Sequence, residues 1–259
     1  MTASTAMTGI CDDLAAEHAA LDAIVAPLDE AGWSKPTPAA GWAVRHQIIH
    51  LVLADIIGRI AVEDPAAFHE FKAKGRTLEE AFGSGKGKSG AELLEWWRDE
   101  RERMLAAFRP LDAKARIPWF GPDMSALSFA TARLMETWAH GQDVVDALGV
   151  ARPATDRLRH VAHIGVTTRG WSYANRGLPS PEGAVRVELT SPGGERWTWG
   201  PEEADAVVRG PAEDFCLVVT QRRHPADTAL VCEGDLAADW MGRAQAFAGP
   251  ATNNRPPRS

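Results

Sequence analysis

Hydrophobic residues recur at helical spacing through the first two thirds of the chain. Apolar residues three and four positions apart predict an amphipathic helix. This pattern predicts helices over 8–31, 43–62, 66–73, 89–108, 124–148 and 155–175. Residues that favour helix ends support these assignments: Pro36 and Pro38 follow the first helix, Ser89 is a good N-cap, and Gly149 suits the C-terminal end of its helix. The pattern therefore predicts a helical bundle.

After Pro179 the spacing of apolar residues changes from helical periodicity to alternation. Residues 185–189 (VRVEL) alternate apolar and polar side chains, and PGG at 192–194 predicts the turn of a hairpin with ERWTW at 195–199. The remaining segments predict a strand at 205–209, a helix at 211–221, a strand at 229–232 and a helix at 235–247.

The two patterns together predict an α+β protein with two domains. We place the boundary near residue 178, between a helical domain over 1–178 and a small α/β domain over 179–250. The polar, proline-containing end of the chain, 251–259, is expected to be a disordered tail.

Composition narrows the class of partner. The chain has 259 residues, 45% of them hydrophobic, and a formal net charge of -7. A negative protein approaches phosphate backbones and anionic lipid against repulsion, so we expect a small-molecule partner and neither nucleic acid nor a membrane. No segment resembles a signal peptide or a transmembrane helix, which favours a cytoplasmic location. Three widely separated cysteines offer no CxxC motif and are interpreted as packing residues.

Three residues carry the chemistry that is most informative. Glu136 and His140 are spaced i, i+4, so one helix face presents both. His50 lies in an apolar stretch, where a buried imidazole needs a partner. If the helices face each other, two imidazoles and a carboxylate suit Zn²⁺ or another divalent first-row metal. A solvated surface pair on one helix, and a core histidine bonded to a carbonyl on the other, are the alternatives that the residues leave open.

Other polar residues are alternative metal ligands or could support the ligands of this site. His46 and His50, and His160 and His163, are also spaced at helical distances and are rival ligand pairs. Several further residues are candidates for hydrogen bonds to a ligand or for contact with a substrate: Gln47, one turn before His50; Asp143, one turn after His140; and His163 and Arg169 in the helix at 155–175.

The glycine-rich loop GSGKGKSG at 83–90 imitates a phosphate-binding loop. The P-loop pattern fails because Phe82 stands where its first glycine belongs, and no buried strand precedes it. We therefore reject nucleotide binding at this loop. Signatures of serine hydrolases, zincins and dinucleotide-binding proteins are absent from the sequence as well.

Two segments make the chain resemble a known family: TPAAGWAVRHQIIHLVLAD and RLMETWAHGQDVVDALG. They are similar to the mycothiol-dependent maleylpyruvate isomerase family of actinobacteria, within the DinB-like metal-binding superfamily. VRVELTSPGGERWTWG and GDLAADWMGRAQAFAG resemble that family's C-terminal domain. His46 stands at a position that is more often acidic in relatives, so the whole chain looks closer to an uncharacterised metal-binding branch than to the isomerase itself.

The resemblance implies an architecture, a site and a cofactor. It implies an N-terminal DinB-like four-helix bundle followed by a small α/β domain, with a metal held by His50, Glu136 and His140. It also implies mycothiol as a thiol co-substrate, and an arginine of the C-terminal domain near the site. Arg222 and Arg223 in TQRRHP are the nearest matches.

The leading hypothesis is a metal-dependent isomerase or thiol S-transferase that acts on a small electrophilic or carboxylate-bearing substrate. The inward apolar stripes of the bundle helices offer no Lys or Arg beside His50, and Arg133 is the only one within one turn of Glu136. We therefore expect the C-terminal domain to supply the cation that binds a substrate carboxylate. The alternatives are a metal-containing protein that binds a small ligand without catalysis, and a structural protein whose site stays empty.

Overall fold

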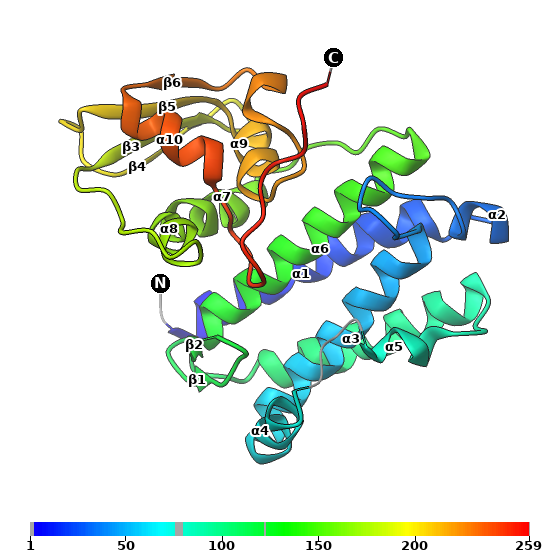
Figure 1. The fold of residues 1–259 in the computed structure, drawn as a ribbon. Helices are drawn as coiled ribbons and strands as arrows, with labels where there is room; N and C mark the ends of the chain where they lie inside the picture. Colours follow the sequence, from blue (N-terminus) through cyan, green and yellow to red (C-terminus); the bar gives the residue numbers. More distant parts are fainter. Residues whose placement is uncertain (1–2, 76–79, 122, 259) are drawn as a thin grey trace. The chain divides into compact units, whose positions relative to one another are not determined.

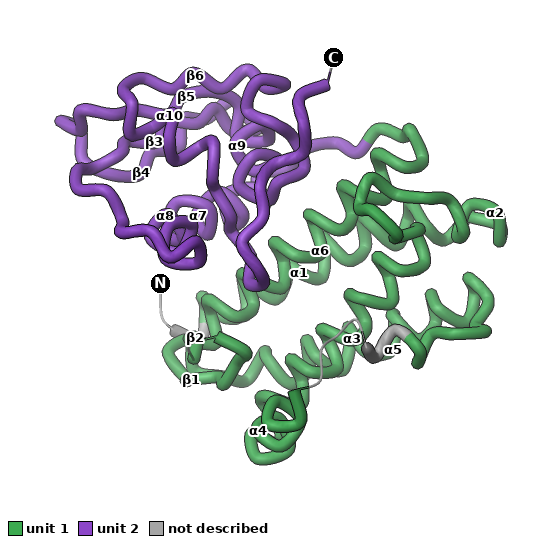
Figure 2. The backbone as a smooth tube through the Cα atoms, viewed as in Figure 1, with its two compact units in different colours: residues 1–151 green, residues 152–259 purple. Residues whose placement is uncertain are grey.

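The computed structural model describes residues 3–75, 80–121 and 123–258 of the chain (Figure 1). The chain forms two compact units, residues 1–151 and residues 152–259, named here the bundle unit and the sheet unit (Figure 2). The four long helices belong to the bundle unit and the four-stranded sheet belongs to the sheet unit, so the predicted α+β class is confirmed. No helix in the described ranges is both long and apolar enough to cross a membrane.

The bundle unit is built from four long helices (Figure 1). Helix α3 packs against α5 and α6, and α1 packs against α6 and α5. The elements are α1 (Ala3–Val25), α2 (Glu30–Trp33), α3 (Val44–Glu63), α4 (Pro65–Ala73), η1 (Glu80–Gly85), α5 (Gly90–Phe108), β1 (Arg116–Ile117), β2 (Met124–Ser125) and α6 (Ala126–Leu148). The predicted four-helix bundle is therefore present, with α1, α3, α5 and α6 as its helices.

Local sequence signals set the ends of these helices. The Ser89 hydroxyl accepts from the Glu92 N–H at 3.3 Å, and the Glu92 carboxylate accepts from the Ser89 N–H at 2.7 Å. This reciprocal pair satisfies backbone donors that the first turn of α5 leaves unpaired. Gly149 follows α6 with φ of 68°, the left-handed conformation that favours glycine. The predicted helix ends at Ser89 and Gly149 are confirmed, but the helix predicted over 8–31 ends earlier, at Val25, and the short helix α2 follows it at Glu30–Trp33.

The bundle core depends on close packing of large side chains. Trp33 and Trp97 are buried together with Ile48, Val52 and Leu93 in one cluster. Burying a side chain of this kind contributes roughly 1.5–3 kcal/mol. Gly90 has a steric reason to be glycine, because a Cβ there would lie 2.1 Å from the Trp33 ring.

The sheet unit contains a four-stranded mixed sheet in the order β4-β3-β5-β6. Strand β3 pairs parallel with β5 and antiparallel with β4, and β6 pairs antiparallel with β5. Helix α9 packs against β3 and β5, and α10 packs against β5 and β6. The elements are α7 (Leu158–Thr167), α8 (Arg169–Ala174), β3 (Val185–Thr190), β4 (Arg196–Trp199), β5 (Ala206–Pro211), α9 (Ala212–Val219), η2 (Pro225–Asp227), β6 (Val231–Glu233) and α10 (Asp235–Arg243).

The structure divides the chain earlier than the predicted boundary near residue 178. The units separate between Ala151 and Arg152, and the predicted helix over 155–175 is two helices, α7 and α8, of the sheet unit. Helix α7 packs so closely against α9 that a Cβ on Gly165 would lie 2.7 Å from the Val219 side chain. An apolar stripe predicts that a helix is packed, but it does not identify the core against which the helix packs.

The end of the chain also differs from the predicted disordered tail. Residues 251–258 form no helix or strand, but hydrogen bonds attach them to the sheet unit. The Thr252 hydroxyl donates to Gln221 Oε1 at 2.7 Å, and the Arg258 N–H lies 3.0 Å from both carboxylate oxygens of Asp227. Residue 259 lies outside the described residues.

Candidate metal centre

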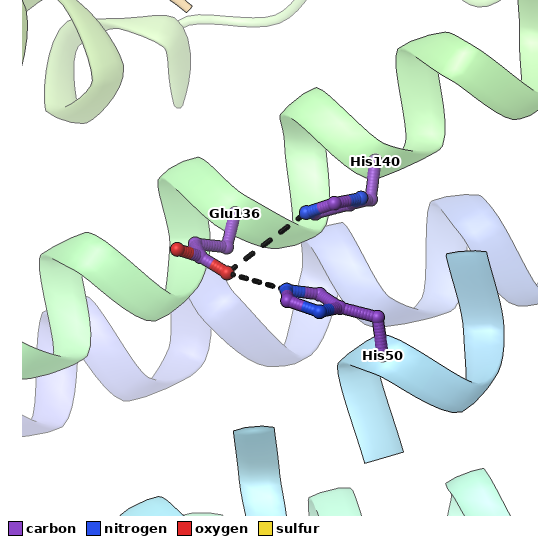
Figure 3. Close-up of side chains that lie close together, drawn as sticks. All are labelled: His50, Glu136 and His140. Atoms are coloured by element: carbon purple, nitrogen blue, oxygen red, sulfur yellow. Dashed lines mark hydrogen bonds and ion pairs between the residues drawn. The ribbon is translucent and has the colours of Figure 1, made fainter. Parts of the chain in front are cut away.

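His50 from α3 and Glu136 and His140 from α6 bring their side chains together inside the bundle unit (Figure 3). The Nε2 atom of His50 lies 3.1 Å from Glu136 Oε2, and the Nε2 atom of His140 lies 4.0 Å from the same oxygen. One ligand atom from each residue fits within 4.8 Å of the others. Within the described part of the chain, this is the one group of three or more His, Cys, Asp or Glu side chains close enough to hold a metal ion.

Helix geometry accounts for this convergence. Glu136 and His140 are one turn apart on α6, and α3 packs against that helix and carries His50. The three side chains are only partly buried, with exposed fractions of 12% for His50, 25% for Glu136 and 15% for His140. The site is therefore sheltered by the bundle but still reachable by a small molecule.

Trp42 forms an aromatic wall beside the two imidazoles. Its ring stacks on His140 with centroids 5.9 Å apart and planes 17° apart, and it lies 5.5 Å from the His50 ring. The two imidazole rings are themselves 4.3 Å apart. The Trp42 ring therefore lies against one side of both imidazoles.

A chain of hydrogen bonds fixes which nitrogen of His140 is available. The Thr37 hydroxyl donates to the Trp42 carbonyl at 2.9 Å, so its oxygen accepts from Gln47 Nε2 at 2.9 Å. The amide oxygen of Gln47 then faces His140 Nδ1 at 2.6 Å and requires a proton there. The lone pair of the neutral ring is left on Nε2, the nitrogen that faces Glu136.

A buried ion pair lies directly behind Glu136. Arg133 donates to Glu136 Oε2 at 3.2 Å and to Asp55 Oδ1 at 2.9 and 3.2 Å. Burial acts to raise the pKa of Glu136, but the hydrogen bond from His50 and the charge of Arg133 outweigh it and hold that pKa well below its ordinary value. Burial raises the pKa of Asp55, and the Arg133 guanidinium opposes that rise.

Gln47 and Asp143 were predicted to support the two histidines. Gln47 does contact a candidate ligand, but that ligand is His140 rather than His50, because α3 directs the amide across to α6. Asp143 is buried in α6 with 1% of its surface exposed, and its hydrogen bond to His140 stays a prediction. His46, a rival ligand, has another role: its Nδ1 accepts from the Ala43 N–H at 2.9 Å and caps α3.

The remaining candidates lie in the sheet unit. His163 is exposed on α7, and His160 and His163 do not belong to a group of potential metal ligands in the described residues. Arg169 donates to the Gly183 carbonyl at 2.9 Å and to the Pro181 carbonyl at 3.2 Å. Arg169 therefore attaches α8 to the loop that precedes β3. Contact of Arg169 or His163 with a substrate stays a prediction.

Arg222 and Arg223 lie in the turn after α9. Arg222 Nη1 donates to the Thr220 carbonyl at 2.6 Å, and Arg223 Nη1 donates to the Arg222 carbonyl at 2.8 Å. Their role at a substrate stays a prediction. Arg133 of the bundle unit is already engaged with Glu136 and Asp55, and the expectation that the C-terminal domain supplies the cation for a substrate carboxylate stays a prediction.

Four residues at the site were not predicted from the sequence: Thr37, Trp42, Asp55 and the inward-facing Arg133. For Asp55 and Arg133, the sequence contained features that could have revealed this placement. Asp55 interrupts the apolar stretch of α3, and Arg133 precedes Glu136 by three residues, a spacing that places both on one helix face. A charged residue in an apolar stripe requires a buried partner.

The sequence of this chain is similar to two family models and to two mycobacterial proteins. Residues 14–145 match the family model described as mycothiol maleylpyruvate isomerase N-terminal domain, and residues 181–233 match a model described as wyosine base formation. Two proteins of Mycobacterium tuberculosis, from different strains and both described as uncharacterised, are 46% identical over 248 residues, which cover 94% of this chain and 96% of theirs.

Solved structures of similar fold include the mycothiol-dependent maleylpyruvate isomerase and a histidine-to-alanine mutant of it. Each has a TM-score of 0.59 and 17% sequence identity, over 90% of this chain and 95% of the other. At this identity the likeness shows that the fold is shared across both units.

Proposed function

Because the chain belongs to the family described as mycothiol maleylpyruvate isomerase N-terminal domain, we propose that it is an enzyme that binds a divalent first-row metal ion, such as Zn²⁺, through His50, Glu136 and His140. The observation that carries the proposal is the convergence of two imidazole nitrogens and a carboxylate oxygen within 4.8 Å. Three protein ligands of these types leave open positions for water or substrate.

The residues around the ligands fit a metal centre. Gln47 holds His140 in the tautomer whose lone pair is on Nε2, as hydrogen-bond partners of metal-bound histidines do. Arg133 keeps Glu136 ionised, and Trp42 shields one side of the imidazoles. When bound, a divalent ion supplies a Lewis acid that lowers the pKa of a coordinated water or thiol.

The proposed reaction is thiol-dependent isomerisation or thiol transfer, with mycothiol as the thiol and a small electrophilic, carboxylate-bearing substrate. In isomerisation, the thiolate forms a C–S bond at one carbon of a double bond conjugated to a carbonyl group, and the π electrons of that double bond move onto the carbonyl oxygen. Rotation follows about the resulting single bond. The electron pair then returns to re-form the double bond as the C–S bond breaks, so the thiolate is regenerated. We propose Arg222 or Arg223 as the residue that binds the substrate carboxylate. The family name of the matching region supports the thiol and the substrate class.

Metal content tests the site. Untagged wild-type protein should contain a stoichiometric amount of a divalent metal by mass spectrometry, and His140→Ala should lose most of it while its helix content stays near that of the wild type. Helical bundles gain most of their stability from apolar packing, so the fold survives this change. His163→Ala is the matched control, because His163 is exposed on another helix. Full metal occupancy in His140→Ala would refute the site.

Turnover tests the reaction and separates an enzyme from a ligand-binding protein. The metal-loaded protein should convert maleylpyruvate, or a related electrophile, only when mycothiol is present. Arg222→Ala or Arg223→Ala should lower kcat/KM strongly without releasing metal, whereas Arg196→Ala, an exposed arginine of β4, should leave both unchanged. Tight ligand binding without any turnover of mycothiol and electrophile would favour the binding protein.

A further inference from the structure

Arg133 connects the candidate metal ligands to a second buried carboxylate. Its side chain is 3% exposed and that of Asp55 is fully buried, so both charges lie inside the bundle unit. Asp55 comes from α3 and Arg133 from α6, the same two helices that carry the three ligands. The two helices are thus joined by an ion pair next to the site.

The contact between Arg133 and Glu136 falls on the oxygen that the metal would use. Glu136 Oε2 faces both His50 and His140, and it also accepts from Arg133 Nη1 at 3.2 Å. A guanidinium stays protonated at any accessible pH. Arg133 therefore competes with a bound metal ion for this oxygen. Its positive charge also repels the metal ion.

Asp55 opposes this competition. It accepts two hydrogen bonds from Arg133, through Nε and Nη2, and leaves only Nη1 directed at Glu136. Its negative charge offsets the positive charge of Arg133 in surroundings where charges are poorly screened. The Asp55–Arg133 pair is then nearly neutral, so a divalent ion at the site is repelled less than it would be by Arg133 alone.

We propose that Asp55 is a positioning residue that sets the metal affinity of the centre by restraining and neutralising Arg133. This role rests on the proposed function, because it requires metal binding at His50, Glu136 and His140. It assigns Asp55 no contact with substrate or metal.

Asp55→Asn tests the charge with little change of shape. Both hydrogen bonds from Arg133 fall on Oδ1, which an asparagine carbonyl replaces, and Oδ2 has no hydrogen-bond partner among the described residues. Zn²⁺ is added to metal-free protein, and its dissociation constant is measured by competition with a chromophoric chelator. We expect Asp55→Asn to weaken Zn²⁺ binding about 10- to 100-fold, the range for groups that support metal ligands.

The double variant Asp55→Asn/Arg133→Met separates charge balance from structural support. Without the uncompensated guanidinium, Zn²⁺ binding should recover to within about ten-fold of the wild type, the lower limit of the range for such supporting groups. Glu100→Gln is the control, since Glu100 is a buried partner of Arg59 and Arg103 and belongs to α5. It should bind Zn²⁺ like the wild type.

Two results would overturn the role of Asp55: wild-type affinity in Asp55→Asn, or a double variant that binds Zn²⁺ as weakly as the single variant. If the single variant does not fold, the double variant alone decides, because a pair that only scaffolds Glu136 predicts that the double variant loses about 10- to 100-fold in affinity. Failure of the wild type to bind Zn²⁺ contradicts the proposed function instead, so the two failures are distinguishable.

Discussion

Glu136 of the bundle unit and Glu188 of the sheet unit are both carboxylates with a lowered pKa, but they have different kinds of partner. Glu136 faces two imidazoles and one arginine inside a helical bundle. Glu188 lies on β3 between the buried Val187 and Leu189, so it points to the opposite face of the sheet. Its pKa falls to about 2 because it accepts hydrogen bonds from arginines on three adjacent strands: Arg209, Arg186 and Arg196.

The chemistry of the partners separates a candidate site from a structural contact. Imidazole nitrogens carry lone pairs and ligate metals, whereas guanidinium groups are donors only. Glu188 and its arginines therefore join β4, β3 and β5 without offering a set of ligands. A lowered pKa alone does not identify a functional residue. The two regions show that the types of partner and their burial must be considered together.

The sharpest difference between the regions should appear when one arginine is removed from each. Arg133→Met leaves Asp55 buried without its cation, which typically costs about 3–5 kcal/mol of unfolding free energy. Arg209→Met removes a side chain that is 43% exposed and should cost far less. Urea denaturation of the two metal-free variants measures both losses. Equal losses would mean that burial does not distinguish the two clusters.

How far the sequence predicts this molecule also depends on the region. Helices α3 and α6 follow from apolar periodicity, and the ligand candidates follow from an i, i+4 pair and a histidine in an apolar stretch. The pairing of Asp55 with Arg133 does not follow, because it depends on how the two helices pack. A buried Asp55 needs a partner, but the sequence alone does not identify which arginine lies beside it.

The helix predicted over 155–175 shows a second limit. Its apolar spacing is that of any packed helix, and only the structure shows that α7 lies against α9 instead of in the bundle. The chain end at 251–258 shows the same limit for polar segments, because its hydrogen bonds to Gln221 and Asp227 join residues distant in sequence. Local pattern predicts the elements, and tertiary contacts assign them to a unit.

His18 is a buried histidine without an ionic partner in the described part of the chain, and its contribution to stability can be tested by changing the pH. It is 2% exposed in α1, packs edge-on against Trp97 at 5.7 Å, and neither ring nitrogen has a hydrogen-bond partner among the described residues. Burial, aided by the positive charges of Arg101 and Arg133, holds its pKa well below the ordinary 6.5. The unfolded chain therefore binds a proton below pH 6.5 that the folded chain excludes, and stability falls as the pH decreases.

We expect the unfolding free energy of the wild type to decrease below pH 6.5 with a His18 contribution of up to about 1.4 kcal/mol per pH unit. His18→Phe keeps the aromatic packing, removes the titrating group and should show a shallower slope. Denaturant titrations at neutral and mildly acidic pH measure the slopes, and His69→Phe on the exposed surface of α4 is the control. Parallel slopes for His18→Phe and the wild type would contradict the assignment.

Glu188→Gln should have the smallest effect, because the ion pairs that it removes lie on a sheet face where two of the arginines, Arg196 and Arg209, are well exposed. The folded pKa is depressed from 4.5 to about 2, so the stabilisation is fully present above 4.5 and disappears as the pH falls to about 2. The wild type should be slightly more stable than the variant at neutral pH. That difference in stability should shrink with added salt and vanish near pH 2, as measured by denaturation under each condition.

The Zn²⁺ affinity of Glu188→Gln should be unchanged, because no group around Glu188 is a metal ligand. A loss of Zn²⁺ binding in Glu188→Gln would show that the two regions are coupled and that their separation by partner chemistry is wrong.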